Sequence, residues 1–204
     1  MTSASYGVQM KNLKNTERHG LKFVFSLAVA ALLTLAASGC TTSDPKPTKV
    51  YKTPDSLCGT AIEPSLLEPA LPPGKKISTK AKNLVGYYSC LVRVDDEYAL
   101  SVLISWHDGD KTALNVASTE RGGGTVIDTQ LTEDRRYAWS EKGGVGQVHC
   151  PEPSVSHRKT DSKLFATIVI YGDEKTTEPE MKKLITAYTE SVSNSDECRA
   201  SKRS

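Results

Sequence analysis

The chain has 204 residues, with 26 Lys or Arg against 24 Asp or Glu and a formal net charge of +2. That length suits one domain of ordinary size, and the sequence gives no sign of a second domain or an internal repeat. The nearly balanced charge argues against nucleic-acid binding, which needs a clustered basic face, so we expect no nucleic-acid partner.

The first 40 residues carry the clearest pattern in the chain. A basic stretch comes first, with cations at Lys11, Lys14, Arg18 and Lys22. The run that follows, residues 23–39, has no charge and ends at Cys40. Its apolar core spans 15 residues, 23–37. Export signals use roughly 7–15 apolar residues and a membrane-spanning helix about 20, so an uncleaved anchor is the alternative to a cleaved signal.

The residues Leu35-Ala36-Ala37-Ser38-Gly39-Cys40 resemble the lipobox of bacterial lipoproteins of the signal peptidase II type. That pattern usually has Leu three residues before the cysteine, where this chain has Ala37. The resemblance implies that the Cys40 thiol receives a diacylglycerol and that cleavage removes residues 1–39, the signal peptide. Acyl chains contribute about 0.8 kcal/mol per buried CH₂, and two chains give stable anchoring. We therefore expect a lipid-anchored protein at the cell membrane, facing outside the cytoplasm.

The remainder divides into a tether, one domain and a tail. Removing residues 1–39 takes away four basic residues and one acidic residue, which leaves 22 basic and 23 acidic residues. Residues 40–56 hold the anchor cysteine and three prolines, so we predict an extended tether that reaches roughly 40–50 Å at about 3.1 Å per residue. Residues 57–198 are predicted to form a single disulfide-bonded domain, and residues 199–204 a solvated basic tail.

Five cysteines are an odd number, which an exported lipoprotein explains. Lipid takes Cys40, and the other four, Cys58, Cys90, Cys150 and Cys198, predict two disulfides outside the cytoplasm. No C-x-x-C motif is present, so neither a thioredoxin-type redox pair nor a zinc ribbon is indicated. Of the three pairings we prefer Cys58 with Cys90 and Cys150 with Cys198, and the sequence leaves the other two open.

The first half of the domain is predicted to hold one short helix and a hairpin. Residues 63–71 form the helix, with Pro64 in its first turn. Residues 87–95 and 98–107 alternate in polarity around a short acidic turn, which indicates two antiparallel strands. On the second strand one face is expected to carry Tyr98, Leu100, Val102, Ile104 and Trp106.

The second half is predicted to hold more strands and a final helix. Residues 112–120 suit a turn or two of helix, and strands are expected at 125–130, 135–141 and 146–150. Gly143-Gly144-Val145-Gly146 is interpreted as a flexible hairpin loop. Residues 164–171 form the most apolar stretch, which favours a central strand covered on both faces.

The last helix has the strongest signal. Thr177-Glu178-Pro179-Glu180 is a capping box with proline in the first turn. One stripe at helical spacing follows, made of Met181, Leu184, Ile185, Tyr188 and Val192. The fold class is therefore predicted as α+β, an antiparallel sheet of about six strands with a short N-terminal helix and an amphipathic C-terminal helix packed on it.

Three groups of polar residues could carry chemistry, and each has a simpler explanation. Trp106-His107-Asp108-Gly109-Asp110 suits a strand and a polar turn, because its oxygen ligands are too few for a hard metal. His149 and Cys150 are neighbours on a strand and point to opposite faces, so they cannot form a catalytic pair. The lysines Lys75, Lys76, Lys80 and Lys82 suit a solvated surface, with anionic wall polymer or lipid headgroups as the alternative contact. We expect no catalytic residue, no metal and no cofactor.

The layout of the chain resembles small uncharacterised lipoproteins of actinobacteria. The likeness lies in Cys40, the segment from Pro45 to Pro54, Cys58 at the opening of the first short helix and Cys90 in an early strand. It implies a surface-exposed, membrane-tethered domain and brings no known activity. We expect a non-enzymatic binding or accessory module for a protein or cell-envelope partner. The alternative is a small-ligand or lipid carrier with a pocket between the sheet and the C-terminal helix.

The lipobox predicts that the sulfur of Cys40 is the point of lipid attachment. The variant Cys40→Ser should accumulate as an unlipidated precursor that retains residues 1–39, because a hydroxyl cannot form the thioether. Metabolic labelling of cells with palmitate checks this, since the wild type should carry the label and the variant should not. Label on the variant would rule out Cys40 as the lipidated residue.

Overall fold

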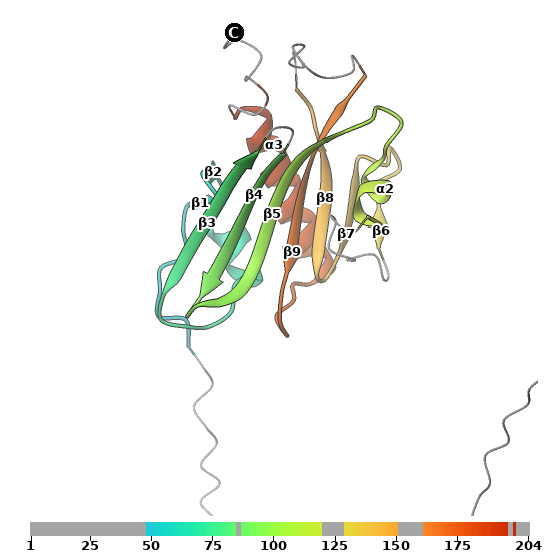
Figure 1. Cartoon of the computed structure of the whole chain (residues 1–204). Coiled ribbons are helices and arrows are strands. Elements are labelled where there is room, and N and C mark those ends of the chain that lie inside the picture. The colour runs from blue at the N-terminus through green and yellow to red at the C-terminus, as the bar shows by residue number, and fades with distance from the viewer. Residues whose placement is uncertain (1–47, 85–86, 120–128, 151–160, 196–197, 199–204) are drawn as a thin grey trace, which may run out of the picture. The chain divides into compact units, whose positions relative to one another are not determined.

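The computed structural model describes residues 48–84, 87–119, 129–150, 161–195 and 198. Within them one sheet has seven strands, all antiparallel to their neighbours, in the order β3-β4-β5-β9-β8-β7-β6 (Figure 1). The strands are β3 (Ile77–Leu84), β4 (Tyr87–Val94), β5 (Glu97–His107), β6 (Gln130–Leu131), β7 (Tyr137–Ser140), β8 (Gly143–Val148) and β9 (Lys163–Ile170). The predicted strand at 125–130 falls mostly outside the described residues.

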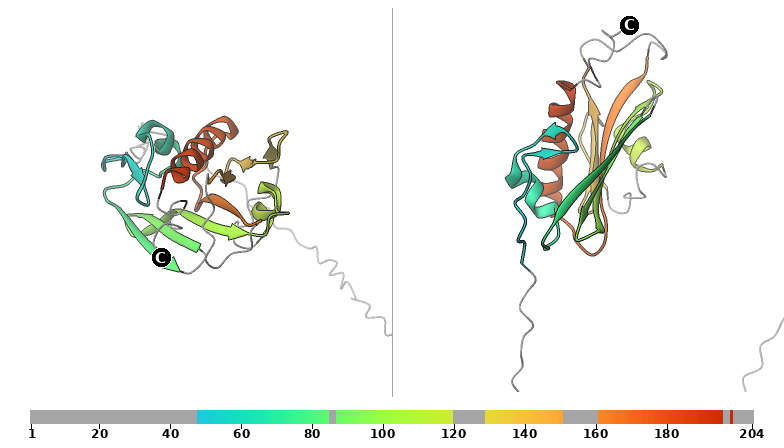
Figure 2. Two further views of the ribbon diagram at one scale, coloured as in Figure 1. Left: turned by 90° about the horizontal axis from the view of Figure 1, so that it is seen from above. Right: turned by 60° about the vertical axis from the view of Figure 1, so that its left-hand side comes forward.

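Helices and a small hairpin cover the two faces of this sheet unequally. The remaining elements are β1 (Ser56–Leu57), β2 (Thr60–Ala61), α1 (Pro64–Leu67), the 3-10 helix at Glu68–Ala70, α2 (Ala113–Ala117) and α3 (Glu178–Ser193). Figure 2 shows α3 and the N-terminal elements on one face of the sheet, and α2 on the other. The domain is thus mostly β with a C-terminal helix packed on the sheet, and the prediction of about six strands is close to the seven observed.

The prediction of a central apolar strand is confirmed. β9 is the fourth of the seven strands and lies between β5 and β8. Every residue from Leu164 to Ile170 is buried, because both faces of the sheet are covered at this position. A strand covered on both faces gains from apolar residues at every position, which explains why this segment does not alternate.

The predicted start and stripe of the C-terminal helix are also confirmed. The Thr177 hydroxyl accepts a hydrogen bond from the Glu180 amide at 3.4 Å, and the Glu180 carboxylate accepts one from the Thr177 amide at 2.8 Å. The Thr177 hydroxyl also donates to the Glu180 carboxylate, at 2.8 Å, and the two bonds from Thr177 to the charged carboxylate lower the pKa of Glu180. All five predicted stripe residues, Met181, Leu184, Ile185, Tyr188 and Val192, are buried.

Strand β8 is formed by the glycine-rich segment that was predicted to be a loop, so that prediction is wrong. The turn before it is short, because Ser140 pairs directly with Gly143. Its glycines face α3: a Cβ atom on Gly144 would lie 2.9 Å from Ile185 Cβ, and one on Gly146 would lie 2.2 Å from Thr189 Oγ1. Glycine is therefore required here by the close approach of the helix, and not by a need for flexibility.

Because of this contact, we predict that even one added methyl group on β8 destabilises the domain. Gly144→Ala should lower the free energy of unfolding by about 1–3 kcal/mol, because the added methyl group meets the Ile185 side chain. Urea unfolding followed by circular dichroism measures the change. Ser89→Ala on β4 is the matched control and should shift stability by no more than about 0.5 kcal/mol. Equal stability of the two variants would show that α3 does not approach β8 this closely.

Candidate functional site

The chain enters the domain earlier than the sequence predicted. The amide of Val50 donates to the Gly74 carbonyl at 2.8 Å, and the amide of Gly74 donates to the Thr48 carbonyl at 3.2 Å. The Lys49 ammonium donates to the Glu68 carbonyl at 2.7 Å. The Tyr51 hydroxyl donates to the Pro72 carbonyl, and burial raises the pKa of Tyr51 to about 12, so the donor stays protonated. Residues 48–56, which were assigned to the tether, therefore contact the domain.

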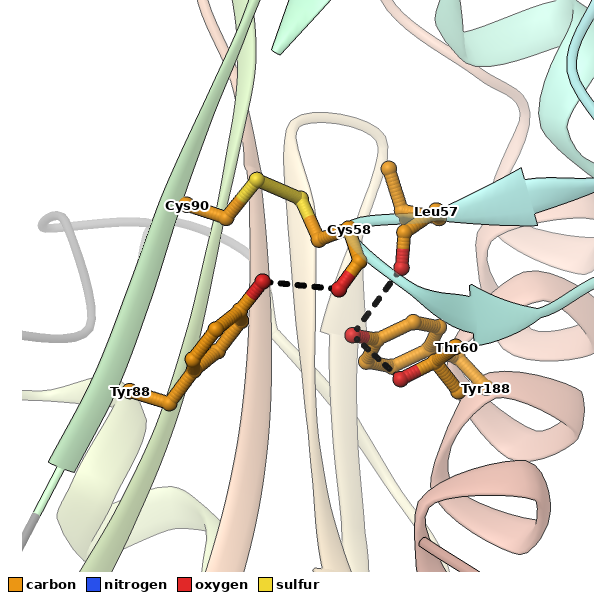
Figure 3. Close-up of a disulfide and its surroundings, with 6 residues drawn as sticks. All are labelled: Leu57, Cys58, Thr60, Tyr88, Cys90 and Tyr188. Atoms are coloured by element: carbon orange, nitrogen blue, oxygen red, sulfur yellow. Dashed lines mark hydrogen bonds between the residues drawn. A yellow bond between two sulfur atoms is a disulfide. The ribbon is translucent and has the colours of Figure 1, made fainter. Parts of the chain in front are cut away.

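A disulfide then fixes this N-terminal segment to the sheet (Figure 3). Cys58 is bonded to Cys90 of β4, and the Tyr88 hydroxyl donates to the Cys58 carbonyl at 2.7 Å. On the helix side the Tyr188 hydroxyl lies 3.5 Å from the Leu57 carbonyl and 3.4 Å from Thr60 Oγ1. Burial raises the pKa of Tyr188, which keeps this hydroxyl protonated as a donor.

A second disulfide joins the two ends of the other half of the domain. Cys150, which follows β8, is bonded to Cys198, which follows α3. Both bonds are those preferred from the sequence. Because Cys150 is committed to a disulfide and His149 beside it is exposed, the two do not form a catalytic pair.

Strand β5 contains a bulge that turns one tyrosine to the other side of the sheet. Val92 pairs with Leu100, but the next residue of β4, Arg93, pairs with Tyr98, so Ala99 is the extra residue. Ala99 is 2% exposed and Tyr98 is 50% exposed. The prediction that Tyr98 shares a face with Leu100 is therefore wrong. Bulges of this kind are common where a side chain is re-aimed for a function.

The re-aimed tyrosine is the centre of an ordered group, the tyrosine cluster, which consists of Arg93, Tyr98, Ser101 and Tyr171. The guanidinium carbon of Arg93 lies 4.5 Å from the centroid of the Tyr98 ring, and its Nη2 donates to the Tyr98 hydroxyl at 2.8 Å. The rings of Tyr98 and Tyr171 are 6.0 Å apart, and the Tyr171 hydroxyl lies 3.0 Å from Ser101 Oγ. Cation–π and hydrogen-bond contacts thus hold exposed side chains in one arrangement.

The cluster belongs to a larger surface, the open face, which is the side of β3, β4 and β5 that points away from α3. Its cross-strand rows are Ser78–Arg93–Tyr98, Lys80–Leu91–Ser101, Lys82–Ser89–Leu103 and Leu84–Tyr87–Ser105. These rows contain three cations and no acidic residue. Leu84, Tyr87 and Tyr98 are 36–50% exposed, so large apolar groups on this surface contact solvent.

On the same side of the sheet the neighbouring strands are covered by α2. Ala113, Val116 and Ala117 of the helix pack on Ala138, Val145 and Phe165. The Thr112 side chain and Asn115 cap this short helix reciprocally, and the helix lies within the range 112–120 predicted for it. Among the described residues, no helix extends this cover over β3, β4 or β5 (Figure 1).

The polar residues at the end of β5 make local contacts. The His107 Nε2 atom lies 2.8 Å from Ser105 Oγ. The His107 and Phe165 rings pack edge to face, with their centroids 5.6 Å apart. Asp110 forms an exposed ion pair with its neighbour Lys111 at 3.3 Å. Within the part of the chain that the structure describes, no group of three His, Cys, Asp or Glu residues could hold a metal ion.

Comparisons of this chain with models of protein families, with curated proteins and with solved structures returned no match. In the described ranges, no helix is both long and apolar enough to cross a membrane. Cys40 and the predicted signal peptide, residues 1–39, lie outside those ranges, as does the predicted basic tail at 199–204. Lipidation therefore stays a prediction from the sequence.

The attachment of the N-terminal segment yields a test of the first disulfide. Replacing both cysteines, Cys58→Ser with Cys90→Ser, should lower the free energy of unfolding by about 3–4 kcal/mol, because the bond closes a loop over a separation of 32 residues. Chemical unfolding at matched pH measures this loss, and limited proteolysis should cut the variant first between residues 48 and 71. Reducing the wild type breaks both disulfides and should lower its stability at least as far. Unaltered stability in both experiments would refute the assignment.

Proposed function

We propose that this protein is a lipid-anchored, extracytoplasmic lipoprotein whose domain is a non-enzymatic binding module of the cell envelope. It engages a protein or another envelope component through the open face. The observation that carries this proposal is the β-bulge at Ala99, which brings Tyr98 out of the core pattern and onto that face beside Arg93.

The composition of the open face suits a binding surface. Tyrosine and arginine are the residues most enriched among those that dominate binding energy at interfaces. Exposed apolar groups rimmed by polar residues mark interaction sites on soluble domains. The stacked Arg93 and Tyr98 side chains are already ordered, so a partner that contacts them loses less conformational entropy than with free side chains.

The position of the chain entry supports a partner close to the membrane. Because residue 48 already contacts the domain, the predicted lipid on Cys40 is separated from it by residues 41–47, which could reach about 22 Å at roughly 3.1 Å per residue. The entering segment pairs with Gly74, and two residues later the Lys76 carbonyl accepts from the Asp95 amide at 2.9 Å. Because Asp95 follows Arg93 by two residues, the tyrosine cluster lies near the end of the sheet where the chain enters. A target within a few nanometres of the bilayer could reach it.

The carrier alternative would need space between the sheet and α3. Along β8 the helix lies directly on the strand, because Gly144 and Gly146 leave no room even for a methyl group. The stripe of α3 fills the rest of that interface with buried side chains. This packing favours the binding module over a carrier.

Site-specific crosslinking in intact cells tests the open face. A photo-reactive phenylalanine analogue at Tyr98 or Leu103 should give discrete crosslinked products. With the analogue at Leu103, Arg93→Ala should reduce them, because it removes the group that orders Tyr98. The same analogue at Lys183, an exposed residue of α3, is the matched control. Products that are equally abundant at Lys183, or none at either open-face position, would count against this surface.

A further inference from the structure

The open face ends at β3, which is a long edge strand within the described part of the chain. β3 is the outermost strand on its side of the sheet, and among the described residues it pairs with β4 only. Seven of its eight residues are exposed. The opposite edge, β6, is two residues long. An edge strand presents unpaired backbone N–H and C=O groups in alternate positions, so β3 is the better template for an added strand.

Two lysines on this edge favour a partner strand that carries acidic residues. Lys80 and Lys82 lie on the open-face side of β3, and both are exposed. Their alternate neighbours, Thr79, Ala81 and Asn83, are small or polar and exposed too. No residue of β3 is acidic, so the positive charge of the edge is not neutralised within its own strand.

The same lysines oppose pairing with a second copy of this chain. In an antiparallel pair of two β3 strands centred on Ala81, Lys80 of each copy lies directly opposite Lys82 of the other. A register shift toward either end places Lys80 opposite Lys80, or Lys82 opposite Lys82. Like charges that face each other directly across two strands are destabilising, whereas opposite charges are stabilising.

We propose that β3 binds an extended acidic peptide segment of a partner protein, which adds to the sheet as an eighth strand. The segment carries Asp or Glu at alternate positions, opposite Lys80 and Lys82, and its backbone bonds the free edge of β3. This inference rests on the proposed function, because it states how the partner reaches the open face. The side chains of the peptide between its acidic residues lie beside Thr79, Ala81 and Asn83, so small or polar residues fit there.

The test uses a fluorescent peptide of alternating Glu and Thr, with a second peptide of alternating Lys and Thr for comparison. Fluorescence anisotropy with the purified, disulfide-bonded domain should show about tenfold tighter binding of the Glu peptide, from opposite rather than like charge pairs. Salt should weaken that binding, because both lysines are exposed. A Glu peptide with N-methylated amides on its bonding edge should not bind, since it lacks the backbone donors.

Charge-reversal variants locate the binding on β3. The double variant Lys80→Glu with Lys82→Glu should prefer the Lys peptide, whereas Lys52→Glu with Lys183→Glu, an equal charge change at exposed sites elsewhere, should keep the wild-type preference. Equal binding of the N-methylated peptide, or no preference for Glu, would overturn the proposal. The proposal would also be overturned if the wild type sedimented as a dimer and the variant Ala81→Cys formed a disulfide between two copies. Each of these outcomes leaves the crosslinking test of the open face standing.

Discussion

The direct contact between α3 and β8 is the constraint on which the rest of this domain depends. Two glycines let the helix axis come close enough for Ile185 and Thr189 to sit against the strand backbone. That approach seals the apolar stripe of α3 and places Tyr188 where its hydroxyl reaches the N-terminal segment. The helix therefore holds both the sheet and the N-terminal segment, and the larger core lies on this side of the sheet, with a smaller one under α2 on the other side.

The two faces of the sheet consequently have different roles. One face is closed by α3, α1 and the β1–β2 hairpin, and its residues contribute stability. On the other face, within the described part of the chain, α2 covers only β7, β8 and β9. The uncovered part can change its surface residues at little cost in stability, because substitutions at exposed positions rarely disturb a core. A binding function on this side and a structural function on the other are physically compatible.

Sequence patterns predicted the elements whose signals are local. The capping box at Thr177 and the apolar run of β9 each determine their own structure, so both predictions were confirmed. The glycines of β8 were misjudged, because the reason for them lies on α3 and is distant in sequence. The bulge at Ala99 was missed because the sequence alternates straight through it, from Tyr98 to Trp106. The edge strand β3 was missed because a strand exposed on both sides does not alternate.

The first disulfide has a mechanical consequence. If the lipid anchor and a bound partner pull in opposite directions, tension enters the domain at residue 48 and acts first on the few hydrogen bonds that hold residues 48–51. Those bonds can break one after another, and the segment between Cys40 and Cys58 can then extend toward about 50 Å at roughly 3.1 Å per residue. Peeling stops at Cys58, where a covalent link passes the force to β4. The N-terminal segment would thus lengthen under small forces, while β3, β4 and β5 stay folded.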